Sequence, residues 1–271
     1  MSIERLLFVS LMADNAAGLY AALSASLTRR LGLAVETVQE PPWQECERML
    51  YQGDAHIGVV CGLQYVDGVD RGERPGLELL AAPVMGASRY GDRPIYFSDV
   101  VVRSDSPARS LADLRGATWA YNEPTSQSGY NVTRYTLAVR GETDGFFGRV
   151  LASGAHQRSL SLLLDGTVDA SAIDSTVLEQ ELRVRPELGQ RRRVIETLGP
   201  SPIPPFVASC MLPAALRSNV RTALLELHED PAEARVLSAW GIARLVPVTD
   251  SDYEPIREMA RIAAAAVLCR P

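Results

Sequence analysis

Two serines and a glycine lie close together in residues 125–129, which read Thr-Ser-Gln-Ser-Gly and follow an expected strand at 117–121. A helix that starts here has backbone N–H groups without internal acceptors and a partial positive charge at that end. The hydroxyls of Ser126 and Ser128 add donors, and Gly129 lets the backbone approach a ligand closely. The segment therefore predicts either an anion site or an ordinary helix cap, where serine is also favoured.

The composition is that of a globular protein. Of the 271 residues, 46% are hydrophobic and 22% charged, and the formal net charge is −6. An acidic balance argues against nucleic acid or an anionic membrane as the main partner. No run of about 18 apolar residues predicts a membrane span. The start at Met1 shows no leader pattern, so we expect a cytoplasmic protein as written, or a periplasmic or lipid-anchored one if a leader was removed.

The basic residues are all arginine, 27 of them, and no lysine occurs. Schiff-base chemistry, lysine-anchored pyridoxal phosphate and a Walker-type phosphate loop are therefore excluded, because each needs a lysine. The four cysteines and three histidines are scattered without metal-ligand spacing, and the cysteines are too few for a disulfide framework. We expect no cofactor and no metal.

Strands and helices alternate along the chain, which predicts an α/β fold with a largely parallel sheet. A helix end, a turn and an apolar strand follow one another near Gly53 and again near Gly166. This repeat predicts two lobes with a ligand cleft between them, the first built from 1–94 and 207–271 and the second from 95–206. The expected strands are 5–11, 34–38, 57–61, 97–103, 117–121 and 193–198, with a turn leading into a buried strand over 166–174. The expected helices are 15–31, 43–51, 110–114, the segment after Ser128, 146–151, 159–164, 213–229, 231–240 and 251–268.

Several short blocks carry a family resemblance that spans most of the chain, at residues 96–98, 111–116, 126–129, 153–156, 165–170 and 201–205. Together they resemble the phosphonate-binding branch of the type II periplasmic binding proteins, the substrate-capture subunits of phosphate, phosphite and phosphonate importers. The resemblance implies two α/β lobes joined by two crossing strands, which close over a small ligand.

The resemblance also implies which residues hold the ligand. The turn would supply hydroxyl and backbone donors to an oxyanion, a histidine would donate from its ring, and a tyrosine would offer its hydroxyl near the hinge. Each has a structural alternative, since the histidine could cap the next helix and the tyrosine could be a hinge aromatic. The residues implied are Ser126, Gln127 and Ser128 with Thr125 beside them, His156, and Tyr96.

Three positions depart from the family pattern or leave alternatives open. Cys61 stands where the first lobe usually has an aromatic hydroxyl, so Tyr65 could take that role, and Cys61 is either a reactive thiol or a small buried apolar residue. No acidic residue follows the proline-rich segment, where Pro205 and Phe206 stand. Asp174 could hold a ligand amine, accept a hydrogen bond from the neighbouring serine, or cap a helix.

These observations predict a solute-binding protein with no catalytic residues. It would capture a small oxyanion of the phosphate, phosphite or phosphonate type for an ABC importer, as a monomer that contacts an ABC permease. The alternative is a cytoplasmic enzyme on the same fold that acts on a small carboxylic acid, like the menaquinone-pathway enzymes that dehydrate a chorismate-like acid, with Asp174 or His156 as general base. A ligand sensor is the third hypothesis.

Overall fold

The structure is a computed structural model that describes residues 3–38, 42–73 and 76–270. The chain forms two compact units, the first made of residues 1–95 and 202–253 and the second of 96–201 and 254–271. The C-terminal segment thus differs from the sequence expectation, which placed all of 207–271 in the first lobe. The physical reason is that Ala266 and Leu268 belong to the hydrophobic core of the second unit.

The first unit is built on a six-stranded sheet of order β11-β4-β10-β3-β1-β2. Strands β1, β2 and β3 are parallel, whereas β10 runs antiparallel to β3 and β4, and β11 runs antiparallel to β4. The sheet is therefore mixed rather than largely parallel, which corrects the sequence expectation. Its strands are β1 (Arg5–Ser10), β2 (Ala34–Val38), β3 (Ile57–Val59), β4 (Leu77–Met85), β10 (Phe206–Ser209) and β11 (Ile242–Val246).

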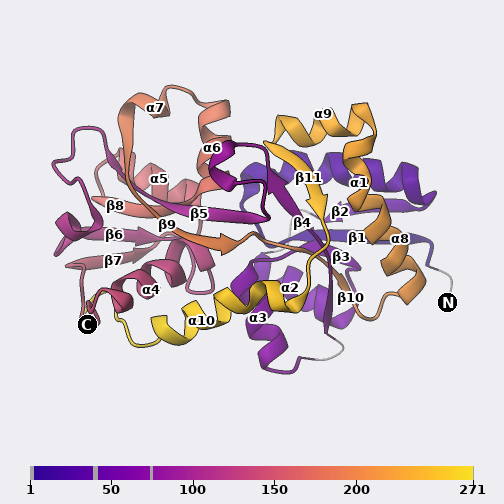
Figure 1. The fold of residues 1–271 in the computed structure, drawn as a ribbon, viewed down its shortest axis with the longest axis horizontal. Coiled ribbons are helices and arrows are strands. Elements are labelled where there is room, and N and C mark those ends of the chain that lie inside the picture. Colours follow the sequence, from indigo (N-terminus) through magenta and orange to yellow (C-terminus); the bar gives the residue numbers. More distant parts are fainter. Residues whose placement is uncertain (1–2, 39–41, 74–75, 271) are drawn as a thin grey trace. The chain divides into compact units, whose positions relative to one another are not determined.

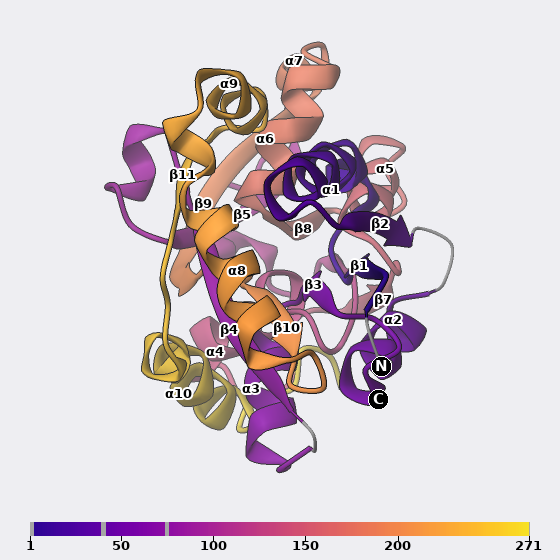
Figure 2. The same ribbon diagram turned by 90° about the vertical axis from the view of Figure 1, so that its right-hand side faces the viewer.

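Helices connect these strands and cover the sheet. Helix α1 (Ala17–Leu31) ends at Gly32, whose φ of 63° is the left-handed conformation that favours glycine at a helix end. Helices α1 and α2 (Trp43–Gln52) lie on opposite faces of the sheet in Figure 2. No helix among the described residues is long and apolar enough to span a bilayer. The other helices of this unit are α3 (Gly62–Asp70), α8 (Ala214–Leu225) and α9 (Pro231–Ala239).

The second unit has a five-stranded sheet of order β7-β6-β8-β5-β9 (Figure 1). Strand β6 is parallel to β7 and β8, and β5 is antiparallel to β8. The strands are β5 (Ile95–Arg103), β6 (Thr118–Tyr121), β7 (Arg149–Ala152), β8 (Ala170–Asp174) and β9 (Arg192–Pro202), and the helices are α4 (Val132–Val139), α5 (His156–Leu164), α6 (Ser175–Val184), α7 (Leu188–Arg191) and α10 (Glu254–Ala263).

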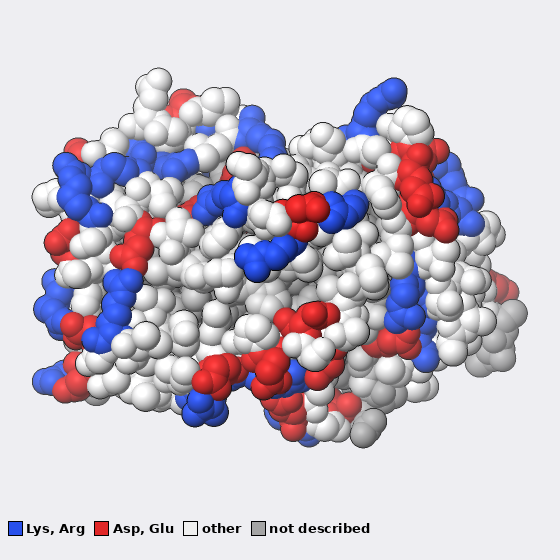
Figure 3. Space-filling view, viewed as in Figure 1, with Lys and Arg blue, Asp and Glu red and all other residues white. Residues whose placement is uncertain are grey.

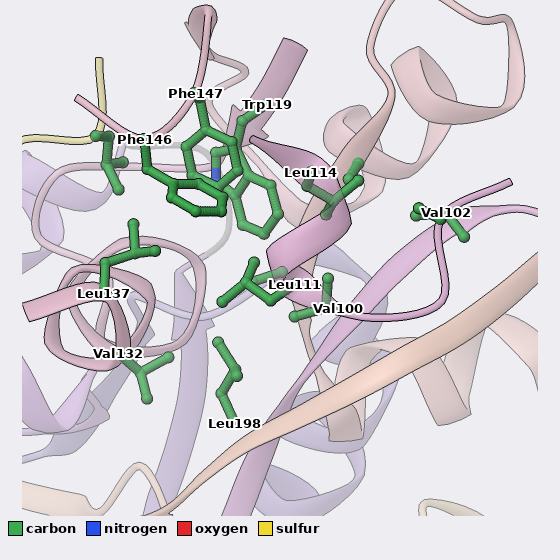
Figure 4. Close-up of a cluster of buried hydrophobic side chains, with 14 of the residues drawn as sticks. Val100, Val102, Leu111, Leu114, Trp119, Val132, Leu137, Phe146, Phe147 and Leu198 are labelled. Carbon is green, nitrogen blue, oxygen red and sulfur yellow. The ribbon is translucent and has the colours of Figure 1, made fainter. Parts of the chain in front are cut away.

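The core of the second unit is centred on aromatic side chains. The rings of Trp119 and Phe147 are stacked with centroids 4.5 Å apart, and Phe146 meets Phe147 edge-on (Figure 4). Helices α4 and α10 pack on each other, and Arg134 Nε donates to the Ala266 carbonyl at 2.9 Å. This packing fixes β6 and α4, the two elements on either side of the serine-rich turn.

The prediction of a helix over 146–151 is wrong. Arg149–Ala152 is strand β7, which pairs in parallel with β6. Phe146 and Phe147 are buried in the core rather than lying on an amphipathic helix. A short apolar run cannot be assigned to helix or strand from its periodicity alone, and here the pairing with β6 decides.

Candidate functional site: the serine-rich turn of the second unit

The serine-rich turn joins β6 to helix α4 through a single π-helical turn, η4 (Gln127–Asn131). Ser126 is the N-cap residue, and its hydroxyl accepts a hydrogen bond from the Gly129 amide at 3.0 Å. The Ser126 amide donates to the Glu123 carbonyl at 3.1 Å. The expected helix start is therefore present, but the Ser126 amide is bonded within the protein, which corrects the expectation that its N–H is available to a ligand.

Ser128 and His156 form a buried polar pair at this helix end. Ser128 Oγ lies 3.0 Å from His156 Nε2, and the Ser128 carbonyl accepts from the Ser98 hydroxyl at 2.6 Å. The Ser128 amide is in the first turn of η4, where a helix offers no internal acceptor. The Ser128 amide and hydroxyl thus lie side by side, with the imidazole bonded to the hydroxyl, and these two donors suit an oxyanion.

The imidazole of His156 is uncharged at neutral pH. His156 is the first residue of α5 and only 6% exposed, and burial lowers its pKa from 6.5 to about 4. Nδ1 has no hydrogen-bond partner among the described residues. A neutral ring with one engaged nitrogen acts through hydrogen bonds rather than through a full positive charge.

Gln127 holds the turn in place with its side chain rather than offering that side chain to a ligand. Its carboxamide is fully buried, and Nε2 donates to Ser201 Oγ and to Met259 Sδ, both at 3.1 Å. Oε1 accepts from Asn131 at 2.7 Å. The side chain thus ties η4 to the end of β9 and to α10.

Replacing Gln127 by leucine should destabilise the second unit by about 2 kcal/mol, because buried donors and acceptors lose their partners. Urea denaturation followed by circular dichroism measures this change in the free energy of unfolding. The matched control is Gln190→Leu, at an exposed position of the same unit, which should change stability by less than about 0.5 kcal/mol. Equal effects of the two substitutions would contradict the anchoring role.

Asp174 lies close to the turn by way of Ser98. In the antiparallel pairing of β5 and β8, Asp174 is directly opposite Ser98, which contacts the Ser128 carbonyl. Asp174 Oδ1 caps α6, accepting from the Thr176 amide at 2.8 Å and hydroxyl at 2.7 Å. Burial raises the pKa of this carboxyl from 3.8 to about 6. The helix-cap alternative for Asp174 is therefore realised.

The remaining candidates lie in both units. Tyr96, 2% exposed, is the first residue of the second unit and lies on β5, while Thr125 directly precedes the N-cap of η4. Cys61 and Tyr65 belong to the first unit, at the N-cap and within α3. The Tyr65 hydroxyl donates to Asp250 at 3.0 Å, so it is engaged within its own unit.

Two polar residues of this site, Ser98 and Asn122, were not predicted from the sequence. Both lie in segments that drew attention, Ser98 in the block at 96–98 and Asn122 just before the serine-rich turn. Asn122 Oδ1 is buried and has no partner among the described residues. Within the described part of the chain, no three His, Cys, Asp or Glu side chains are grouped so that they could hold a metal ion.

The charge of the second unit is balanced. Counted over its two ranges, the second unit has fifteen arginines and fifteen acidic residues, so the whole net charge of −6 belongs to the first unit. Figure 3 shows both signs interspersed on the face in view. An anion that approaches this turn therefore meets no net repulsion from the unit that carries it.

The chain is similar to known binding proteins over nearly its full length. A family model described as ABC transporter, phosphonate, periplasmic substrate-binding protein matches residues 10–253. A binding-protein component of an ABC phosphonate transporter from Pseudomonas aeruginosa has a TM-score of 0.84 at 19% identity, covering 97% of this chain and 87% of that one. PhnD1 from Prochlorococcus marinus, in complex with methylphosphonate, has a TM-score of 0.83 at 18% identity, covering 97% and 99%.

The same fold occurs with a chemically different ligand. A protein of Xanthomonas citri bound to ATP has a TM-score of 0.72 at 18% identity, covering 97% of this chain and 98% of that one. These likenesses confirm the two-lobe type II periplasmic-binding-protein fold. The ligand cleft between the lobes and the roles of the individual site residues stay predictions.

Proposed function

Because this chain belongs to the family of phosphonate ABC transporter periplasmic substrate-binding proteins, we propose that it holds a small oxyanion of the phosphate, phosphite or phosphonate type at residues 126–129. Membership of the family makes it a solute-binding protein. The observation that carries the ligand class is the buried pair of Ser128 and His156 beside the first-turn amide of η4. The Ser128 amide and hydroxyl are hydrogen-bond donors that can converge on one tetrahedral anion, and the bond to His156 holds the hydroxyl in place.

The family also supports a proposal for the cellular location of this chain and for its transport partner. The family is one of periplasmic proteins that serve ABC transporters. We expect the chain to act in the periplasm as a monomer that delivers its ligand to an ABC permease. The second unit would carry the anion site, and Cys61 and Tyr65 of the first unit would be additional ligand contacts.

An enzymatic function has less support from the geometry. A serine and a histidine 3.0 Å apart resemble the first two members of a hydrolytic triad. In a triad, however, a carboxylate accepts from the other ring nitrogen, and His156 Nδ1 has no partner of any kind among the described residues. The pair is better suited to donating hydrogen bonds to an anion than to activating a nucleophile.

The ligand class is tested by thermal denaturation with methylphosphonate, phosphite, phosphate, sulfate and acetate, each at millimolar concentration. A ligand at 100 times its Kd stabilises the native state by about 2.7 kcal/mol, which is a clear rise in the midpoint. We expect a rise with at least one of the three phosphorus oxyanions and none with planar acetate. No rise with any tetrahedral oxyanion would refute the proposal.

Replacing Ser128 by alanine should weaken binding of the preferred oxyanion by about tenfold or more, because one donor is lost and His156 loses its partner. Isothermal titration calorimetry measures the change in Kd. Ser161→Ala is the matched control, since Ser161 is an exposed serine of α5 whose hydroxyl only donates to the Gln157 carbonyl. A similar loss in both variants would point to a general effect on folding.

A further inference from the structure

Two buried polar side chains, Asn122 and His156, lie beside Gly129 in the serine-rich turn. Asn122 Oδ1 and His156 Nδ1 are both shielded from solvent, and neither has a hydrogen-bond partner among the described residues. An unpaired polar atom in such a place costs about 1–3 kcal/mol, so each calls for a physical explanation. Because both side chains lie beside Gly129, one arrangement can explain both unpaired atoms.

Gly129 is what brings the two side chains together. A Cβ atom at this position would lie 1.9 Å from Asn122 Oδ1 and 3.1 Å from His156 Cε1, the ring carbon bonded to Nδ1. Only a residue without a side chain allows the carboxamide and this edge of the imidazole to approach the same point of the backbone. Gly129 therefore acts here through close approach.

The Ser128 hydroxyl has one proton to give, and the tautomer of His156 decides where it goes. If the imidazole proton is on Nδ1, Nε2 must accept, and the hydroxyl proton of Ser128 points at the ring. If the proton is on Nε2, the ring donates to Ser128 Oγ, and the hydroxyl proton is available to an anion. Only the second tautomer makes Ser128 a donor toward a ligand.

The second tautomer leaves a lone pair on Nδ1, which needs a donor. The Asn122 carboxamide can supply one, because a half-turn about χ2 exchanges its oxygen and nitrogen with little change in shape. We propose that Asn122 is a positioning residue whose side-chain N–H donates to His156 Nδ1. This keeps the imidazole proton on Nε2 and directs the Ser128 hydroxyl proton to the bound anion.

The result is a chain of donors that runs from Asn122 through His156 and Ser128 to the ligand. Hydrogen bonds aligned in this way polarise one another, so the last donor is strengthened. The site then favours an unprotonated ligand oxygen, which accepts only. The ligand end of this chain rests on the proposed function, whereas the tautomer of His156 can be measured without any ligand.

The test is nitrogen NMR of the protein labelled with 15N-histidine, which has only three histidines. We expect His156 to have its proton on Nε2 in the wild type. His56 is an internal reference, because its Nδ1 accepts from the Leu7 amide at 2.9 Å and so must have its proton on Nε2. An imidazole proton found on Nδ1 of His156 in the wild type would overturn the proposal.

Three variants show whether Asn122 sets the tautomer. Asn122→Leu removes the donor and should shift His156 toward the Nδ1–H form, whereas Asn122→Asp, close in shape and able only to accept, should require a proton on Nδ1. Gln157→Leu removes a neighbouring carboxamide whose Oε1 also lacks a partner among the described residues, and it should leave the tautomer unchanged. An unchanged tautomer in both Asn122 variants would contradict the positioning role.

Binding data separate this inference from the proposed function. Asn122→Leu should weaken methylphosphonate binding about tenfold, the value of one hydrogen bond. If the tautomer shifts but the affinity does not change, the link from His156 to the ligand is refuted. If the wild type binds none of the oxyanions and the tautomer behaves as expected, the proposed function fails while the role of Asn122 in fixing His156 stands.

Discussion

Replacing His156 by glutamine and replacing Asp174 by asparagine should change the pH dependence of the free energy of unfolding in opposite directions. Burial lowers the pKa of His156 to about 4, and burial raises the pKa of Asp174 to about 6. Both side chains are almost fully buried in the second unit, so these shifts are coupled to its stability. The two groups titrate over nearly the same pH range, and their contributions oppose each other.

The direction of each effect on stability depends on whether the folded or the unfolded state binds the proton more tightly. The folded protein resists protonation of His156, so its contribution is full above pH 6.5 and is lost as the pH falls toward 4. The folded protein holds the proton on Asp174, so that contribution is full below pH 3.8 and is lost as the pH rises through 6. Each shift of two to three pKa units corresponds to about 3 kcal/mol.

We therefore expect His156→Gln to gain stability relative to the wild type as the pH falls from 6.5 to 4, by about 3 kcal/mol. Asp174→Asn should lose about as much over the same range, because asparagine still caps α6 but no longer titrates. The pH profiles of the two variants should diverge from the wild type on opposite sides. Other titrating groups are common to all three proteins and cancel in the comparison.

The measurement is urea denaturation of the second unit at several pH values. Trp119 is the only tryptophan of that unit, so its fluorescence in a Trp43→Phe and Trp240→Phe background reports on it alone. His228→Gln is the control for loss of a histidine, since His228 is exposed and lies in the first unit. Parallel pH profiles for His156→Gln and the wild type would show that His156 is not held neutral by burial.

The local part of the site was predictable from the sequence because its bonds are local. The Ser126 hydroxyl accepts from the amide three residues further on, which is the ordinary geometry of a serine cap. A strand followed by Ser-Gln-Ser-Gly is therefore enough to predict the helix start. The block order along the chain led to the family in the same way, since it depends on sequence and not on packing.

The parts of the site and fold that could not be predicted depend on contacts between segments far apart in the chain, for which the sequence gives no direct signal. Gln127 is anchored by Ser201 and Met259, which are 74 and 132 residues away. The same packing moves α10 into the second unit, against the expected lobe boundary. Asn122 could not be recognised from the sequence because its proposed role depends on His156. His156 is the first residue of α5, and the fold places it beside Gly129, where Asn122 also lies.

Replacing Trp119 by alanine should have the largest effect on stability, a loss of about 3–5 kcal/mol for the second unit. Trp119 is fully buried in the middle of β6, stacked on Phe147, and paired across the sheet with Val150 on one side and Ala170 on the other (Figure 4). Alanine leaves a large cavity there, because neighbouring strands and α4 cannot collapse into it without breaking their own pairing.

Trp119→Phe is the matched control, because it keeps an aromatic ring against Phe147. The indole Nε1 is buried without a partner among the described residues, so the substitution also removes an unsatisfied donor, and its cost should be much smaller than that of alanine.

Circular dichroism melts give the stabilities, and calorimetry with the preferred oxyanion gives the affinities. Strand β6 leads directly into the serine-rich turn, so Trp119→Ala should weaken binding along with stability, whereas Trp119→Phe should retain both. Retained affinity in a strongly destabilised Trp119→Ala protein would mean that the turn keeps its shape without the core beneath it, and that the anion site does not depend on the packing of β6.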